Sequence, residues 1–307
     1  MMKNTAVTLS VLSTLLHSTT AFVNYVVFNA NSSGPTDGYQ TFSAADRMPN
    51  ETHAVTWNYA SNLNQNWTWT VKSSNVLMPN LTKGNVDDAA NWTANGHVAY
   101  TTYDFSWPQG GSLNAAVKNA SEQNNGAYSP SCMYMLWANF PLNVSAKYDP
   151  SSSDCTSALG AECVKAITGN ISASTTCSAN DFPSYSKYRD VCADSFGAID
   201  GDGLATQGYR PSLAFGNATA ASNATSLQSG STWAWTLSYP YAADNTTAFE
   251  TEKEKLRVIA VSTGGQNRLL CNRVSDTVEN AASPALRIQG MAVVVIVAMV
   301  AAVMNAM

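Results

Sequence analysis

The stretch "NWTWTV", Asn66–Val71, decides the fold class, and a related string, "TWAWTL", recurs at Thr232–Leu237. In a β-strand successive side chains point to opposite faces, so the two tryptophans and the valine of the first string share one face. Asn66 opens an Asn-x-Thr glycosylation sequon, and a bulky glycan requires the solvent face. We therefore expect the tryptophans to point inward, into a core rather than toward a sugar ligand.

The second string continues the pattern. Alternation predicts one apolar face opposite a face of small and polar residues, as in a half-buried strand. The residues expected to share the apolar face are Trp233, Trp235, Leu237, Tyr239 and Tyr241.

Most of the chain consists of short aromatic or β-branched runs bounded by Asn, Ser, Gly or Pro, which is typical of strands. Many such strands with turn-rich connections predict a mainly β fold, a sandwich- or barrel-like antiparallel domain. The expected strands are Tyr25–Phe28, Ala54–Tyr59, Trp67–Val71, His97–Trp107, Met133–Trp137, Trp233–Tyr241, Val258–Thr263 and Leu269–Arg273.

Residues 151–201 interrupt this pattern and are interpreted as a short helical, disulfide-stapled insertion. The segment "SDCTSALGAECVKAI", Ser153–Ile167, places apolar residues at helical spacing after an N-cap at Ser153 or Asp154. In one continuous helix Cys155 and Cys163 lie about 12 Å apart, beyond the reach of a disulfide. Each is therefore expected to pair elsewhere.

Six cysteines in a secreted chain predict three disulfides, and their connectivity stays open apart from that exclusion. Zinc is disfavoured because the sequence contains no Cys-x-x-Cys pair. The cysteines are Cys132, Cys155, Cys163, Cys177, Cys192 and Cys271.

Eleven Asn-x-Ser/Thr sequons occur, and all of them lie in the expected mature segment, between the signal peptide and the C-terminal attachment signal. An Asn-rich chain also generates sequons by chance, but occupancy of half of them still makes a glycoprotein. The sequon asparagines are Asn31, Asn50, Asn66, Asn80, Asn91, Asn119, Asn143, Asn170, Asn217, Asn223 and Asn245.

Residues 1–21 carry Lys3, a short apolar run and small residues up to Ala21, the pattern of a cleaved secretory signal peptide. Residues 22–275 are expected to form one β-rich extracellular domain. A spacer, 276–290, contains the small residues typical of a lipid-anchor (GPI) attachment site. Asn280 is the favoured ω residue, with Ser275 and Ala281 as the alternatives.

The uncharged C-terminal tail, 291–307, completes the GPI signal that is removed on attachment. The alternative is a retained span, as in a single-pass type I membrane protein. Two features oppose it: no basic residue follows Arg287, and the unbroken apolar run of Met291–Met304 is short for a ~30 Å hydrocarbon core.

Catalytic signatures are scarce in this sequence. Only His53 and His97 remain as neutral-pH bases after signal removal, and neither a Gly-x-Ser-x-Gly nor a His-Glu-x-x-His motif occurs. Asp200 and Asp202 are spaced like the start of a calcium loop, but the rest of that motif is missing. No cofactor or metal is expected. Pairs of carboxylates suited to glycoside hydrolysis are numerous, so that chemistry stays open.

The net negative charge argues against nucleic acid as a partner. The formal net charge is −5 and charged residues make up 12 % of the chain, so no basic surface is expected to attract nucleic acid. The mixed run "ETEKEK", Glu250–Lys255, is interpreted as a solvated turn or short helix.

The block Ser131–Ile167 combines a Cys-bearing aromatic strand with an Asp-Cys-x7-Cys motif, and in this it resembles secreted ascomycete glycoproteins. The resemblance covers 37 of 307 residues. It implies a fungal cell-surface or cell-wall setting, often with GPI anchoring, and carries no catalytic residue.

These features predict a GPI-anchored, N-glycosylated surface or wall glycoprotein with a structural, adhesive or glycan-binding role. Its expected partners are the membrane, through the lipid anchor, and cell-wall polysaccharide or other surface glycans. The alternative is a GPI-anchored hydrolase or transglycosylase that acts on wall polysaccharide.

Overall fold

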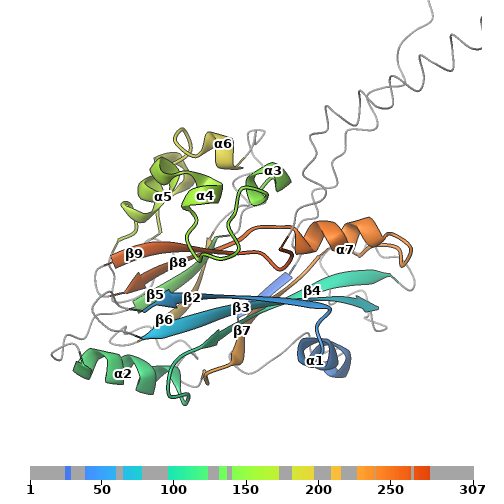
Figure 1. The fold of residues 1–307 in the computed structure, drawn as a ribbon, viewed down its shortest axis with the longest axis horizontal. Coiled ribbons are helices and arrows are strands. Elements are labelled where there is room, and N and C mark those ends of the chain that lie inside the picture. The colour runs from blue at the N-terminus through green and yellow to red at the C-terminus, as the bar shows by residue number, and fades with distance from the viewer. Residues whose placement is uncertain are drawn as a thin grey trace, which may run out of the picture.

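Two antiparallel sheets stacked face to face form the centre of the protein (Figure 1). The computed structural model describes residues 25–28, 39–59, 65–77, 96–123, 131–136, 140–172, 182–196, 209–215, 227–238, 240–263 and 266–276. The signal peptide, the ω residue Asn280 and the apolar tail predicted from the sequence lie outside these residues.

The first sheet has five strands in the order β1-β7-β4-β3-β2. The second has four, in the order β6-β5-β8-β9. Each neighbouring pair is antiparallel, which confirms the predicted fold class. The strands are β1 (Tyr25–Phe28), β2 (Glu51–Asn58), β3 (Asn66–Leu77), β4 (His97–Ser106), β5 (Ser131–Leu136), β6 (Tyr209–Phe215), β7 (Ser231–Leu237), β8 (Arg257–Thr263) and β9 (Gln266–Asn272).

Short helices cover the outer faces of the sandwich (Figure 1). Those of the Cys-rich segment lie over the four-stranded sheet, α1 packs on β3 and β4, and α7 lies beside β4. The helices are α1 (Tyr39–Arg47), α2 (Leu113–Gln123), α3 (Leu142–Ser145), α4 (Thr156–Leu159), α5 (Ala161–Thr168), α6 (Ala193–Phe196) and α7 (Thr246–Lys253), with a 3-10 turn, η3 (Tyr185–Lys187).

Aromatic side chains fill the space between the sheets. Trp69 lies parallel to Phe105 with ring centroids 6.3 Å apart, and Trp233 meets Phe105 edge-on at 5.0 Å. Met133 and Ile259 of the opposite sheet belong to the same buried cluster. The inward orientation predicted for the Trp-x-Trp string of β3 is therefore confirmed, with Asn66 exposed on the other face.

The single apolar face predicted for the second string is wrong. The pairing of β4 with β7 shifts register between Tyr103 and Asp104, because Trp233 is an extra residue of a β-bulge between Thr232 and Ala234. The bulge turns Trp233 into the space between the sheets, whereas Trp235 packs in a separate cluster with Phe42 of α1. Both tryptophans of β7 are buried, so the sheet buries apolar residues on both of its faces.

The helix predicted over Ser153–Ile167 is divided in two. Gly160 has a φ of 81°, a backbone angle that residues with a side chain rarely adopt, and it separates α4 from α5. Cys155 forms the N-cap of α4 instead of Ser153 or Asp154, although Asp154 Oδ1 accepts a hydrogen bond from the Thr156 amide.

Four elements escaped the sequence analysis, namely β6, α1, α2 and α3, and of α7 only the charged end was considered as a short helix. Each of these helices is short and buries only one to three apolar side chains, which gives the sequence little periodicity to detect. In α1 Phe42 is fully buried, with its ring 4.9 Å from Tyr100 of β4. Contact with the sheet, more than helix propensity, stabilises a helix this short.

Removal of a central indole should destabilise the sandwich strongly. Trp69 is fully buried, so Trp69→Ala should lower the free energy of unfolding by about 3–5 kcal/mol. Met48→Ala, at a side chain that is 79 % exposed, should change it by less than about 0.5 kcal/mol. Urea unfolding of both variants measures the difference. Equal effects would contradict the assignment of Trp69 to the core.

Candidate functional site

A cluster of charged and hydroxyl side chains lies where α1 meets the five-stranded sheet. Lys72 of β3 places its Nζ 2.5 Å from Asp104 Oδ2 of β4 and 3.3 Å from Asp46 Oδ1 of α1. Hydroxyl groups complete the contacts: Thr102 Oγ1 donates to Asp46 Oδ1 at 2.8 Å, and Thr232 Oγ1 donates to Asp46 Oδ2 at 3.4 Å. The cluster joins α1 to three strands.

Burial controls protonation in this cluster. The Asp104 side chain is only 7 % exposed, and desolvation raises its pKa even though the Lys72 ammonium opposes the shift. Desolvation alone would lower the pKa of Lys72, but the attraction of the two carboxylates outweighs it and the pKa is raised. Asp104 is therefore the carboxylate of this group that burial drives toward the protonated form.

The geometry places one constraint on catalysis. Both carboxylates bind the same ammonium, so their bound oxygens lie within about 6 Å of each other, close to the separation found in retaining glycosidases. In those enzymes the two carboxyl groups flank a sugar, whereas here Lys72 lies between them. As arranged, the cluster anchors α1 to the five-stranded sheet.

The charged run Glu250–Lys255 is not solvated as the sequence analysis expected. Four of its residues, Glu252 to Lys255, are buried where α7 runs into β8. Lys253 pairs with Glu51 of β2 and lies 2.7 Å from Glu250, while Lys255 pairs with Glu252. Alternating signs let the run neutralise itself, so it can be buried where a run of one sign could not.

The two candidate histidine bases serve separate structural contacts. His53 donates from Nδ1 to Asn272 Oδ1 at 2.7 Å, and His97 donates from Nδ1 to Asn75 Oδ1 at 2.8 Å. They therefore do not form one catalytic pair. Among the residues that the structure describes, no group of three His, Cys, Asp or Glu side chains could hold a metal. Asp200 and Asp202 lie outside that part of the chain.

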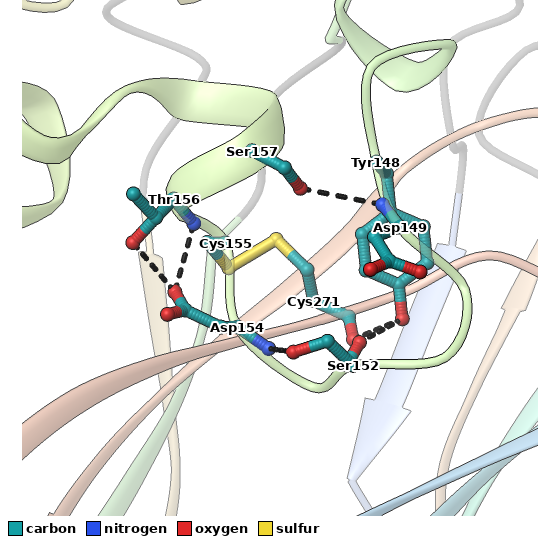
Figure 2. Close-up of a disulfide and its surroundings, with 8 residues drawn as sticks. All are labelled: Tyr148, Asp149, Ser152, Asp154, Cys155, Thr156, Ser157 and Cys271. Carbon is teal, nitrogen blue, oxygen red and sulfur yellow. Dashed lines mark hydrogen bonds between the residues drawn. A yellow bond between two sulfur atoms is a disulfide. The ribbon is translucent and has the colours of Figure 1, made fainter.

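One described disulfide attaches the helical layer to the sheet below it, and a second lies within that layer. Cys155, at the start of α4, bonds to Cys271 near the end of β9, as Figure 2 shows, and Cys163 of α5 bonds to Cys192. The prediction that Cys155 and Cys163 pair elsewhere is confirmed. Cys132 is also disulfide-bonded, and Cys177 lies outside the described residues. The bonds indicate an oxidising compartment.

Hydrogen bonds surround the Cys155–Cys271 bridge (Figure 2). The Tyr148 hydroxyl donates to the carbonyls of Cys271 at 2.9 Å and Ser152 at 2.8 Å. Burial raises the pKa of this phenol well above its ordinary value, so it stays a donor at neutral pH. Tyr148 thereby links the chain before α4 to β9.

The described sequon asparagines all lie at the surface. They come from the α1–β2 turn, from β3, α2, α3 and the end of α5, and from the N-cap of α7, so they are spread over the molecule. The six exposed residues are Asn50, Asn66, Asn119, Asn143, Asn170 and Asn245. The other five, Asn31, Asn80, Asn91, Asn217 and Asn223, lie outside the described residues.

Tryptophan, the usual stacking surface for sugar rings, is buried throughout the described chain. Its six described copies are Trp57, Trp67, Trp69, Trp107, Trp233 and Trp235.

No helix in the described part is both long and apolar enough to cross a membrane. Comparisons with protein-family models, with curated proteins and with solved structures found no match to this chain.

Asp104→Asn should change how stability depends on pH. The folded state holds the Asp104 proton where the unfolded chain has released it. The stability that this group contributes is therefore present below its ordinary pKa of 3.8 and is lost as pH rises through the raised value. The asparagine that replaces Asp104 cannot titrate, so the variant does not lose this stability. Its unfolding free energy relative to wild type, measured by urea titration, should therefore increase with pH between 3.8 and the raised pKa.

Asp149→Asn is the matched control of opposite sign. Hydrogen bonds from Ser151 lower the pKa of the exposed Asp149 carboxylate, so its contribution is present at neutral pH and is lost as pH falls through the lowered value. The unfolding free energy of this variant relative to wild type should decrease as pH rises. If the relative unfolding free energies of both variants changed with pH in the same direction, the assignment of Asp104 as a buried carboxylate with a raised pKa would be contradicted.

The two disulfides should differ in their contribution to stability. The Cys155–Cys271 bond joins residues 116 apart and the Cys163–Cys192 bond residues 29 apart. Loop-closure entropy then predicts losses of about 5 kcal/mol for Cys155→Ala/Cys271→Ala and about 3.5 kcal/mol for Cys163→Ala/Cys192→Ala. Chemical denaturation under non-oxidising conditions measures both. A larger loss for the second pair would overturn this order.

Proposed function

We propose that the chain is a secreted, N-glycosylated and GPI-anchored glycoprotein of the cell surface or cell wall, with a structural, adhesive or glycan-binding role. One observation carries this proposal: six sequon asparagines on six different segments are all exposed. A glycan can be attached at each of them without unfolding the sandwich. The disulfides support secretion because such bonds persist in oxidising compartments.

The structural role is favoured over catalysis by how the polar groups are used. Lys72 binds both Asp46 of α1 and Asp104 of β4 and so holds the helix on the sheet. Both histidines are hydrogen-bonded to asparagines. The buried tryptophans leave the described surface without an indole on which a sugar could stack. Any glycan binding by the described surface therefore relies on hydroxyl, amide and charged groups, because every Tyr and Phe whose exposure the structure describes is buried as well.

The alternative is a GPI-anchored hydrolase or transglycosylase of wall polysaccharide. The proximity of Asp46 and Asp104 is the observation in its favour. A glycan array together with turnover assays on β-glucan, chitin and mannan separates the two functions. Turnover that is lost in Asp104→Asn but retained in Asp149→Asn would establish the hydrolase, whereas binding without turnover supports the structural glycoprotein.

Glycosylation can be tested at Asn66 with a matched set of variants. Asn66→Gln and Thr68→Ala both destroy the sequon, whereas Thr70→Ala changes the next outward residue of β3 and leaves the sequon intact. Intact-mass measurement should show one glycan fewer in the first two variants and none lost in the third. If peptide N-glycosidase treatment removed no glycan mass from the wild-type protein, the proposal that the chain is N-glycosylated would be contradicted.

Anchoring is tested separately on cells. A phospholipase C specific for phosphatidylinositol should release the protein into the medium, because the proposed anchor contains the bond that this enzyme cleaves. A protein that stays in the membrane fraction after treatment, while a known GPI-anchored control is released, would instead support a retained single-pass span.

A further inference from the structure

We propose that residues 271–276 form a mechanical junction, which passes force from the C-terminal tether into both sheets and prevents β9 from peeling away. The proposal rests on the anchor proposed above, since force enters at this end only if the chain is tethered there. Within the described residues the chain ends at Asp276, immediately after β9.

An edge strand next to a tether is mechanically weak. β9 is the last strand of its sheet and pairs with β8, in a ladder that runs from Asn272 opposite Arg257 to Gln266 opposite Thr263. Force applied beyond Asn272 would break the hydrogen bonds of this ladder one after another. Without further attachments the strand would separate while the rest of the sandwich stayed intact.

Covalent attachment occurs one residue before the end of β9. Cys271 is bonded to Cys155, and Tyr148 donates to the Cys271 carbonyl (Figure 2). The Cys271 amide also donates to the Ser153 carbonyl at 2.9 Å. The outer edge of β9 is therefore held by the segment that leads into α4. Peeling that begins at the C-terminus must stop at Cys271 as long as the disulfide is intact.

The next residue connects β9 to the opposite sheet. Asn272 is fully buried, and its Nδ2 donates to the carbonyls of Trp69 at 3.2 Å and His53 at 3.4 Å. Its Oδ1 accepts the bond from His53 Nδ1 already described. Load on this residue is thus shared with β2 and β3, the two strands next to the aromatic core.

Arg273 fastens the chain after the strand ends. Its guanidinium is 2 % exposed and donates to three backbone carbonyls, from Nη1 to Ser145 at 2.5 Å, from Nε to Ser275 at 2.6 Å and from Nη2 to Asp276 at 2.8 Å. The Ser275 amide also donates to the Lys253 carbonyl at 3.2 Å. Residues 273–276 are therefore bound to α3 and to the end of α7.

The three consecutive residues 271, 272 and 273 thus bind three different layers: the helical layer, the five-stranded sheet and the α3–α7 region. A polar surface loop that only connected a domain to its anchor would need none of these contacts. Their convergence at the exit of the chain is the observation that carries the proposal.

Single-molecule pulling tests the junction. One handle replaces the C-terminal tail 291–307, and the second is attached through an encoded azide at Lys118, an exposed position on α2. In Cys155→Ala/Cys271→Ala, residues 266–276 should peel first and give an early extension of ~4 nm. Wild type should show no such step before the sandwich unfolds. The control Cys163→Ala/Cys192→Ala, which removes a disulfide away from the exit, should behave as wild type.

A second pair of variants keeps the disulfides and covers the case in which the cysteine variant does not fold. Arg273→Lys retains the charge but not the three-way contact, so residues 272–276 should extend at lower force by ~2 nm. Arg268→Lys, on the same strand, should not. An early step in wild type, or none in either test variant, would overturn the junction. Because both handles are attached artificially, these outcomes do not depend on release by the phospholipase, which tests the anchor alone.

Discussion

The packing of Trp69 and Trp233 against Phe105 is the interaction on which the rest of the structure depends. Neither sheet can bury its inner face alone, and these rings supply the large apolar surfaces that bring the two together. The bulge at Trp233 is part of the same solution, because it turns one indole of β7 inward while the next indole remains available to α1. A regular strand would have left one layer without its aromatic contact.

Polar groups are buried where a helix or a chain end joins a sheet. Lys72 joins α1 to the first sheet, the run from Glu252 to Lys255 joins α7 to β8, and Arg273 holds the chain after β9. In each place opposite charges or backbone carbonyls compensate the lost hydration, which is the condition for burying ionised groups. These polar clusters therefore hold the elements of the fold together.

Disulfides and glycosylation sequons occupy different kinds of position in the molecule. The Cys155–Cys271 bond joins the helical layer to the four-stranded sheet and the Cys163–Cys192 bond lies within that layer, where short helices such as α4 are not stable by themselves. The six described sequon asparagines lie on turns, on exposed positions of helices or their caps, and on the outward side of β3, where a glycan displaces only water. Dense glycosylation and a buried aromatic core can thus coexist in a chain with few charged residues.

Much of this could be predicted from local pattern. Period-two alternation beside the Asn66 sequon identified the inward face of β3, and eight of the nine described strands were expected, because strand signals reside in neighbouring residues. The cluster around Lys72 could not be predicted, since Asp46, Lys72 and Asp104 are brought together by strand pairing and by a helix with a weak apolar pattern. The charged run was misjudged for the same reason: its composition resembles a solvated segment, and its burial also depends on ion pairs with Glu51 of β2 and Arg257 of β8.

By itself the sequence determined a mainly β domain with inward-facing tryptophans and cysteines that cannot pair within one helix, because these follow from spacing along a single segment. Only the tertiary structure decided the bulge that separates Trp233 from Trp235, the pairing of Cys155 with Cys271, and the attachments of Asn272 and Arg273. Each of these joins segments far apart in the chain, and such contacts depend on how the layers stack rather than on any local preference.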